Sequence, residues 1–321
     1  MNLEEQFGIT EEQVRHAAEF LRNGKLVAFP TETVYGLGAN ALDADAVSRI
    51  FEVKGRPHSS PVIVHVSNRE MVSTVVSDWP EKARVLAARF WPGPLTLVVP
   101  KTPVVPDVVT AGLPTVGVRM PAHPVALALI EAAQVPVAAP SANRFTQISP
   151  TTAEHIRQRI GDRVDYILDG GPCEVGIESA VLSLGEEVPV LLRPGGITRQ
   201  QIEELIGAVT LANDKFEGAH PSPGMHARHY SPRTQLFLLR DGRVPDSGTG
   251  AYLQIASPPV GNVREVVPMP NHAAEYAVRL YGVLHDLDTR GYDWIAVETP
   301  PPGVEWSAVL DRLRRAATAT L

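Results

Sequence analysis

The chain has 321 residues, of which 44% are hydrophobic and 20% are charged, and its formal net charge is -7 at pH 7. This composition describes a globular chain long enough for about two domains. Because 36 Asp and Glu residues outnumber 29 Lys and Arg residues, the long-range field repels polyanions and excludes a protein that binds nucleic acid by bulk phosphate neutralisation.

Cysteine content and hydropathy indicate where the protein works. Cys173 has no second cysteine for an internal disulfide or a zinc cluster, which is typical of a reducing compartment. The N-terminal segment is acidic and lacks the order of a secretory signal, and no apolar run approaches the roughly 18 residues that cross a bilayer. We therefore expect a cytoplasmic protein without a membrane segment.

The first predicted elements are a helix and a buried strand. Thr10 and Gln13 have the spacing of a capping box, apolar residues follow at helical intervals, and Asn23-Gly24 ends the helix. The apolar run at residues 26–29 then stops at Pro30, which is typical of a strand that delivers the next loop to the surface.

Strands and helices then interleave without strict alternation. Helical spacing predicts helices near residues 44–53, 81–90, 124–133, 152–160 and 199–206. Short apolar runs predict strands at residues 62–66, 95–99, 115–119, 135–139, 166–168, 180–184 and 190–193. We therefore expect an α/β domain with a mixed sheet over residues 1–207.

The pattern changes at about residue 208. Residues 208–233 are polar, contain Pro, Gly and His, and have no sustained period, so they are predicted to form a linker. Beyond it, predicted strands at 235–239, 251–255 and 294–297 and predicted helices at 273–287 and 305–317 indicate a smaller α/β domain over residues 234–321.

Residues 36–41, GLGANA, fit a relaxed dinucleotide-binding pattern. That fingerprint requires its first glycine at the end of a strand and an acidic residue about 20 positions later. Here residues 31–35 intervene and the acidic residue is missing, so the context argues against a dinucleotide site.

Polar strings follow several predicted strands or helices, and each has two readings. Thr33 in the loop at 30–36 suits a small polar ligand or a turn cap. Lys54 and Arg56 flank a glycine and suit either phosphate binding or a solvated helix end. His65 lies in an apolar strand, where it is either a core residue or a ligand contact.

Three further strings repeat this ambiguity. Arg119 ends a strand, where it suits a carboxylate clamp or a structural ion pair, and Arg193 precedes Pro-Gly-Gly, as in an ordinary turn. Residues 138–143, AAPSAN, suit close approach of backbone to a ligand, or a turn. Together, convergent cations in an acidic protein predict a small anionic substrate.

In order, these strings closely resemble the threonylcarbamoyl-adenylate synthases of the YrdC-like family. The resemblance is carried by PTETVYGLG at 30–38, KGRP at 54–57, WPGPLT at 91–96, VGVRMP at 116–121, PSAN at 140–143, SPT at 149–151, Glu178-Ser179 and LRPG at 192–195. SPGMHARHYSP at 222–232 resembles the linker of the long, two-domain form, and residues 276–280 and 311–313 resemble its C-terminal domain.

The resemblance implies a fold and a reaction. The fold is a YrdC-like domain with a twisted mixed sheet and flanking helices, a linker, and a smaller Rossmann-like C-terminal domain. We hypothesise that the linker acts as a lid over the bound adenylate. The reaction converts L-threonine, bicarbonate or carbon dioxide, and ATP with Mg²⁺ into threonylcarbamoyl-AMP and pyrophosphate. The product passes to a tRNA threonylcarbamoyl transferase complex, and strong direct tRNA binding is not expected.

The resemblance also implies roles for individual residues. Catalytic roles fall to Lys54, Arg56 and Arg119, while the metal ligands stay unassigned. The threonine-binding set is Thr33, His65, Arg119 on the substrate carboxylate, the Ala139 backbone and Ser179. The ATP-binding set is Lys54, Arg56, Ser60, Thr115, Ser141, Asn143, Ser149, Arg193, His229 and Tyr230.

The chain departs from the family pattern at three places. Ala180 stands where the family has a threonine, Phe145-Thr146 where it often has Ser-Gly, and Ala227 where the linker often carries a tyrosine. If that tyrosine covers the nucleotide, closure here relies on His226, His229 or Tyr230.

Two alternative functions stay open at this point. An RNA-binding module would fit the family's link to tRNA, although neither a basic stripe nor an aromatic platform is visible. A related carbamoyl-adenylate-forming domain would use carbamoyl phosphate for enzyme maturation, although zinc-finger-like cysteine pairs and an acylphosphatase-like segment are missing from the sequence.

Overall fold

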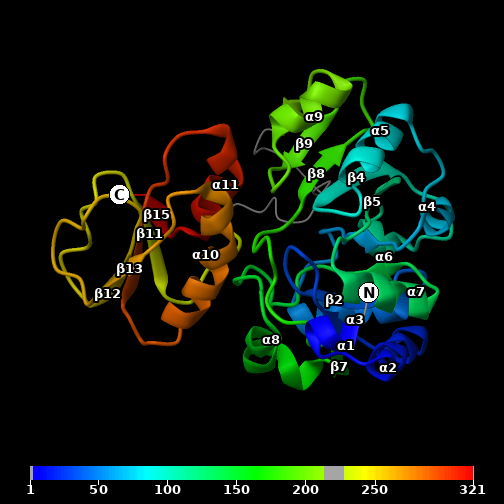
Figure 1. The fold of residues 1–321 in the computed structure, drawn as a ribbon, viewed down its shortest axis with the longest axis horizontal. Coiled ribbons are helices and arrows are strands. Elements are labelled where there is room, and N and C mark those ends of the chain that lie inside the picture. Colours follow the sequence, from blue (N-terminus) through cyan, green and yellow to red (C-terminus); the bar gives the residue numbers. More distant parts are fainter. Residues whose placement is uncertain (1–2, 213–227, 321) are drawn as a thin grey trace.

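The computed structural model describes residues 3–212 and 228–320, which form two β-sheets with separate sets of helices (Figure 1). The remaining linker residues, 213–227, include His226 and Ala227 and lie outside the described residues. We call residues 3–212 the N-terminal unit and residues 234–320 the C-terminal unit.

A ten-stranded sheet runs through the N-terminal unit in the order β10-β9-β8-β4-β5-β3-β6-β2-β1-β7. Its neighbours pair both parallel, as in β3 with β5, and antiparallel, as in β4 with β5, so the predicted mixed sheet is confirmed. The strands are β1 (Val27–Phe29), β2 (Gly36–Asn40), β3 (Val64–His65), β4 (Leu95–Pro100), β5 (Thr115–Arg119), β6 (Val137–Ala138), β7 (Tyr166–Ile167), β8 (Ala180–Ser183), β9 (Val190–Arg193) and β10 (Thr210–Leu211).

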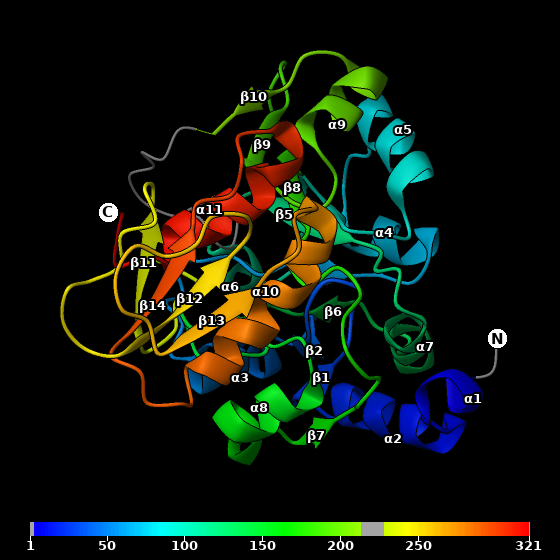
Figure 2. The same cartoon turned by 60° about the vertical axis from the view of Figure 1, so that its left-hand side comes forward.

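Helices flank this sheet, as Figure 2 shows from a second direction. Within the described residues, none is long and apolar enough to span a membrane. They are α1 (Leu3–Phe7), α2 (Glu11–Arg22), α3 (Ala44–Lys54), α4 (Arg69–Val75), α5 (Glu81–Phe90), α6 (Asp107–Thr110), α7 (Pro124–Ala133), α8 (Ala153–Ile160) and α9 (Arg199–Ile206), with a short 3-10 turn at Gly161–Arg163.

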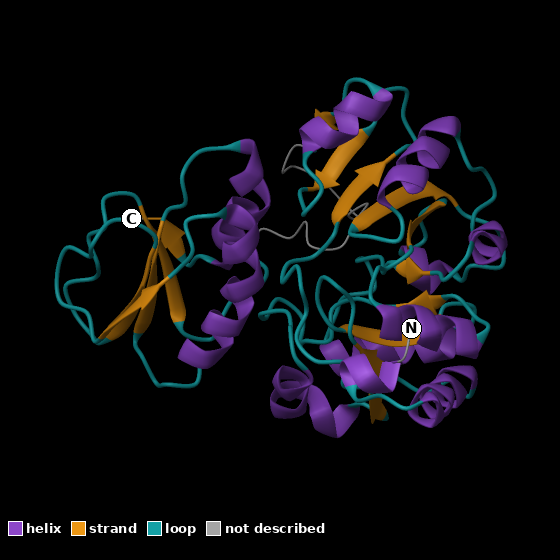
Figure 3. Cartoon of the chain, viewed as in Figure 1, coloured by secondary structure: helices purple, strands orange, loops and turns teal. Residues whose placement is uncertain are grey.

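The C-terminal unit contains a five-stranded sheet in the order β13-β12-β14-β11-β15, and every pair in it is parallel. Both of its α-helices cover one face of this sheet, the face toward the N-terminal unit (Figure 3). The elements are β11 (Gln235–Leu239), β12 (Gly250–Gln254), β13 (Glu265–Pro268), α10 (Ala273–Leu287), β14 (Trp294–Glu298), a 3-10 turn (Val304–Trp306), α11 (Ser307–Ala316) and β15 (Ala319–Thr320).

Local signals in the sequence set several of these boundaries. The Thr10 hydroxyl accepts from the Gln13 amide at 3.2 Å and the Gln13 side chain accepts from the Thr10 amide at 2.9 Å, so the predicted capping box is present. Gly55 ends α3 in the left-handed conformation, with φ at 62°, which a glycine adopts without strain.

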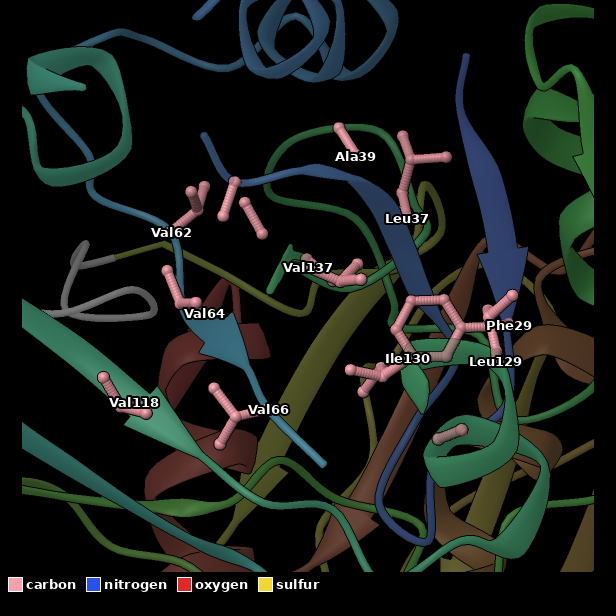
Figure 4. Packing of buried hydrophobic residues seen from close by; sticks show 14 of the residues in the cluster. Phe29, Leu37, Ala39, Val62, Val64, Val66, Val118, Leu129, Ile130 and Val137 are labelled. Carbon is pink, nitrogen blue, oxygen red and sulfur yellow. The ribbon is translucent and has the colours of Figure 1, made fainter. Parts of the chain in front are cut away.

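Gly36 and Gly38 lie in strand β2, and not in a strand-to-helix turn of the kind that a dinucleotide site requires. A Cβ on Gly38 would lie 2.8 Å from the Phe29 ring and 2.9 Å from the Val137 side chain, so this glycine allows close packing between strands. Figure 4 shows Phe29 and Val137 here, with Leu129 and Ile130 of α7 beside them.

Apolar packing also joins the two units. The hydrophobic cluster that contains the buried residues of α10 and α11 also includes Val34, Ile148, Ile177 and Tyr230, which come from outside the C-terminal unit. A second contact is Asp288 at the end of α10, which pairs with Arg159 of α8 at 2.7 Å. The C-terminal unit is therefore anchored on the loops of the larger sheet.

We expect Gly250→Ala to lower the free energy of unfolding by about 1–3 kcal/mol, because its Cβ would lie 2.1 Å from the Trp294 ring. Gly282→Ala in α10 is the matched control, since nothing lies within 4 Å of its Cβ and alanine should raise helix stability by up to ~1 kcal/mol. Urea unfolding midpoints measure both, and a Gly250→Ala protein as stable as wild type would contradict this packing.

Candidate adenylation site

One pocket collects residues from the ends of several strands and from the linker. Its volume is about 40 Å³, so its walls lie close together. It is lined by Thr31, Thr33, Val34, Gly36, Arg56, Ile63, His65, Arg119, Ala139, Pro140, Ser141, Glu178, Ser179, Arg193, His229 and Tyr230.

Arg119, the last residue of β5, is held from three sides. Its Nε donates to the Gly93 carbonyl at 3.2 Å, Nη1 donates to Thr33 Oγ1 at 3.0 Å, and Nη2 lies 2.6 Å from Glu32 Oε2. The contact with Glu32 is a charge contact without hydrogen-bond geometry. The structural ion pair and the position in the pocket therefore coexist, and losing Glu32 would strand a buried charge at a cost of about 3–5 kcal/mol.

The loop after β1 forms a compact turn that orients Thr33. Thr31 Oγ1 donates to the Val34 carbonyl at 2.6 Å and lies 2.8 Å from Thr33 Oγ1. Thr33 thereby faces both the pocket and the Arg119 guanidinium. The hydroxyls cap a turn, as one reading of the sequence predicts, and they also line the pocket.

His65 lies in β3, on the pocket wall, with 4% of its surface exposed. Burial lowers the pKa of His65 to about 3, and Arg119 adds to this shift against opposing backbone hydrogen bonds. Its Nδ1 is buried and has no hydrogen-bond partner within the described residues. A neutral imidazole with an open nitrogen suits a contact with a ligand hydroxyl or amine.

Lys54 and Arg56, on either side of Gly55, have different surroundings. Lys54 Nζ donates to the Ser141 carbonyl, to the Asn143 carbonyl at 2.6 Å and to Asn143 Oδ1 at 3.2 Å, so it braces the loop after β6. Burial lowers the pKa of Lys54 well below its ordinary value, Arg56 lowers it further, and Glu178 opposes them. Arg56 instead lines the pocket, with Nη2 donating to Ser60 Oγ at 2.7 Å.

Ser179 and Arg193 bring two further loops together. Arg193 Nε donates to the Ser179 carbonyl at 3.0 Å and Nη2 to Ser179 Oγ at 3.2 Å. Ser179 Oγ also lies 2.8 Å from the hydroxyl of Thr96, which is 0% exposed. The serine hydroxyl is therefore fixed between a cation and a neighbouring strand.

The structure gathers most of the predicted site residues. All of the proposed threonine set lines the pocket, as do Arg56, Ser141, Arg193, His229 and Tyr230 of the proposed ATP set. The others lie outside the lining: Thr115 at the opposite end of β5 from Arg119, and Lys54, Ser60, Asn143 and Ser149 buried behind the loops. Their roles toward ATP stay predictions.

Sequence reasoning passed over two buried carboxylates. Glu32 balances Arg119, and Glu178 accepts hydrogen bonds from Ser149 Oγ and from residues of the C-terminal unit. Both belong to strings that resemble the family, but their partners are distant in sequence. The excess of cations over acids in these strings is the signal that could have pointed to them.

Two family models match consecutive parts of the chain. The family model described as Telomere recombination, which covers Sua5, YciO and YrdC, matches residues 19–195. The chain belongs to the Sua5/YciO/YrdC family. A second model, described as Threonylcarbamoyl-AMP synthase, C-terminal domain, matches residues 197–318. The Sua5/YciO/YrdC domain is thus followed by a second domain of known type.

Several relatives of this Sua5/YciO/YrdC protein match it along nearly its whole length. Threonylcarbamoyl-AMP synthase of Pyrococcus abyssi is 43% identical over 96% of this chain and 95% of its own. The protein of the same name from Bacillus subtilis is 40% identical over 99% and 96%. The crystal structure of P. abyssi Sua5 complexed with L-threonine has a TM-score of 0.90 and 41% identity, covering 98% of this chain and 97% of that one.

We expect the His65 imidazole to stay neutral in the folded protein from pH 8 down to about pH 4, because burial and Arg119 hold its pKa at about 3. In the unfolded chain it titrates near pH 6.5. The unfolded state therefore binds more protons between these values, and the stability contributed by neutral His65 is present above pH 6.5 and lost as the pH falls toward 3.

Imidazole nitrogen NMR shifts across this range measure the titration, with the urea-unfolded protein as reference. Unfolding free energies provide a second measurement, because His65→Asn should flatten their decline between pH 6.5 and 4. A midpoint for folded His65 above pH 5.5 would contradict its burial as a neutral group.

Proposed function

We propose that this protein is an L-threonylcarbamoyladenylate synthase, which converts L-threonine, bicarbonate and ATP to threonylcarbamoyl-AMP and pyrophosphate. The observation that carries the proposal is the convergence of Thr33, His65, Arg119, Ala139 and Ser179 on one pocket that also holds Arg56 and Arg193. The full-length similarity to synthases, one of them solved with L-threonine, supports the same reaction.

Threonine binds in the part of the pocket around Arg119. The guanidinium takes the substrate carboxylate, and Thr33, which Arg119 already orients, takes a second polar group. Neutral His65 offers its Nδ1, which has no hydrogen-bond partner among residues 3–212 and 228–320, to the substrate hydroxyl or amine. A neutral imidazole leaves the positive charge in this region to Arg119, so the carboxylate has one defined place to bind.

The reaction then needs charge stabilisation more than proton transfer. The deprotonated amine of threonine attacks the carbon of bicarbonate, and water leaves to give a carbamate. An oxygen of this carbamate then attacks the α-phosphorus of ATP as the bond to pyrophosphate breaks. Arg56 and Arg193 line the pocket where phosphoryl oxygens would gather charge. Holding three reactants together supplies much of the rate. In this scheme the enzyme is a nucleotidyltransferase.

Mg²⁺ enters the proposal with ATP. No group of three or more His, Cys, Asp or Glu side chains that could hold a metal occurs in residues 3–212 and 228–320. Phosphate oxygens of ATP and water molecules would be ligands of the ion, as is common for Mg²⁺, and the ion would neutralise phosphate charge. Arg56 and Arg193 would share that task from the protein side.

The pocket must open before the substrates bind. The pocket volume of about 40 Å³ is below the roughly 300 Å³ at the lower end for small-molecule sites, so binding requires its walls to separate. His229 and Tyr230, at the described end of the linker, form one of those walls.

We propose that the product serves a tRNA threonylcarbamoyl transferase complex in the cytoplasm, without strong tRNA binding by this chain.

With ATP, Mg²⁺, threonine and bicarbonate, we expect pyrophosphate release that stops when threonine is omitted. A coupled pyrophosphate assay measures it, and mass spectrometry identifies threonylcarbamoyl-AMP. Release that persists without threonine would sink the proposal, and carbamoyl phosphate in place of threonine and bicarbonate tests the related carbamoyl-adenylate chemistry. Tight RNA binding that weakens steeply with salt would favour the RNA-binding alternative.

Arg119→Ala should chiefly weaken the use of threonine, and Arg56→Ala should chiefly weaken the use of ATP. Losing a hydrogen bond to a charged group costs about 1.5–3 kcal/mol, so we expect the KM for threonine to rise roughly tenfold to hundredfold in the first variant. The KM for ATP should rise similarly in the second. Initial rates of pyrophosphate release measure both, with exposed Arg89→Ala of α5 as control; identical profiles would undo this partition.

A further inference from the structure

Arg312 of α11 is a buried cation that contacts the larger sheet's loops. Its side chain is 0% exposed, and burying a charge costs free energy unless the charge is paired. Nε donates to Glu178 Oε2 at 2.8 Å, Nη2 to the Glu178 carbonyl at 3.2 Å, and Nη1 to the Pro194 carbonyl at 2.9 Å. One guanidinium from the C-terminal unit thus joins two loops of the N-terminal unit.

Tyr281 of α10 contacts the same carboxylate. Its hydroxyl donates to Glu178 Oε2 at 3.1 Å, and Ser149 Oγ donates to Oε1 of the same group. Burial raises the pKa of Glu178, but Arg312 and Arg193 outweigh it and hold the pKa below the ordinary value. Glu178 is therefore an ionised anchor that receives donors from both units.

Both anchored loops carry residues of the proposed site. Ser179 directly follows Glu178, and Arg193 directly precedes Pro194. The loops are also packed against each other without slack, since a Cβ on Gly195 would lie 2.1 Å from the Ala180 amide nitrogen. A displacement of either anchor would therefore displace the Ser179 hydroxyl and the Arg193 guanidinium, which hydrogen-bond to each other.

Arg312 reaches the linker as well. Its guanidinium lies 5.2 Å from the centre of the Tyr230 ring, which lines the pocket, and that ring in turn stacks on Tyr281 at 6.0 Å. A cation over an aromatic face attracts it. Three walls of the pocket, the loops at Ser179 and Arg193 and the linker at Tyr230, thus converge on one side chain of the C-terminal unit.

We propose that Arg312 and Tyr281 are positioning residues through which the C-terminal unit sets the geometry of the adenylation pocket. This inference rests on the proposed function for its kinetic test. The two side chains act through Glu178 and Pro194 and touch no reacting atom. Replacing them should disturb the placement of Ser179 and Arg193 while leaving both hydrophobic cores in place.

Two pairs of variants separate positioning from stability. Tyr281→Phe deletes the hydroxyl that binds Glu178, and Tyr276→Phe deletes a hydroxyl in the same helix that is buried without a partner among the described residues. Arg312→Lys keeps the charge but loses the planar fork that joins two loops, and Arg314→Lys is its exposed control in α11.

We expect Tyr281→Phe to lower kcat/KM for ATP in pyrophosphate release by roughly threefold to tenfold, and Arg312→Lys by roughly tenfold or more. Tyr276→Phe and Arg314→Lys should match wild type. The urea midpoint of Tyr281→Phe should fall below that of Tyr276→Phe only by the loss of one hydrogen bond, so that both variants stay folded under assay conditions. A fall in the urea midpoint with unchanged kinetics would overturn the proposal, because the contacts would then be structural only.

Hydrogen–deuterium exchange gives a readout that needs no activity. Peptides covering residues 176–183 and 190–197 should exchange faster in Tyr281→Phe and Arg312→Lys than in their controls, while peptides from β12 should not change. Equal exchange in variants and controls would overturn the inference even in an active enzyme. If wild type releases no threonine-dependent pyrophosphate, the proposed function fails, and the exchange result still decides the positioning.

Discussion

The burial of positive charge around one junction of the large sheet constrains the rest of this structure. Lys54, Arg56, Arg119, Arg193 and Arg312 are all less than 7% exposed. The carboxylates that pair with these cations in the described residues are Glu32, Glu178 and the partly buried Asp311, so the cations outnumber the acids. A buried charge without a partner costs several kcal/mol. The fold must therefore supply partners that are not acids, and the surplus positive field favours an anion in the pocket.

Backbone carbonyls supply much of that compensation. Arg119 donates to Gly93, Arg56 to Ser60 and Pro61, and Arg312 to Pro194. Carbonyl dipoles stabilise a cation without cancelling its charge, so the field remains available to phosphate and carboxylate groups. Prolines stand at these places: two of the carbonyls belong to Pro61 and Pro194, and Gly93 stands between two prolines, so fixed φ angles restrict the backbone that carries these carbonyls.

The C-terminal unit also supplies hydrogen-bond partners to the buried charges. Its sheet is fully parallel and its two helices cover only the face toward the site, so the helices carry Tyr281 and Arg312 directly to Glu178. The apolar contact with Val34 and Ile177 packs these helices against the N-terminal unit, and Glu178 and Arg312 are buried there. Low dielectric strengthens each of these hydrogen bonds and makes each unpaired group costlier, which couples the two units mechanically.

Local patterns predicted most elements, because capping and apolar periodicity depend on neighbours in sequence. The capping box at Thr10 and the strand ending at Arg119 are examples. Strand β2 escaped prediction, since its small residues suit a strand only where Phe29 and Val137 press against them. Strands β3 and β6 were predicted to be longer than they are, because pairing with distant strands decides where a strand ends.

The sequence by itself determined the inventory of the site: which cations, hydroxyls and histidine stand at the ends of elements, and which family they resemble. Tertiary structure decided how each group is used. Lys54 braces the loop at Asn143, while Arg56, two residues later, faces the pocket. Only the folded chain brings Arg312 to Glu178, because the pairing of buried charges depends on which groups lose their water together, and that is set by contacts between distant parts of the chain.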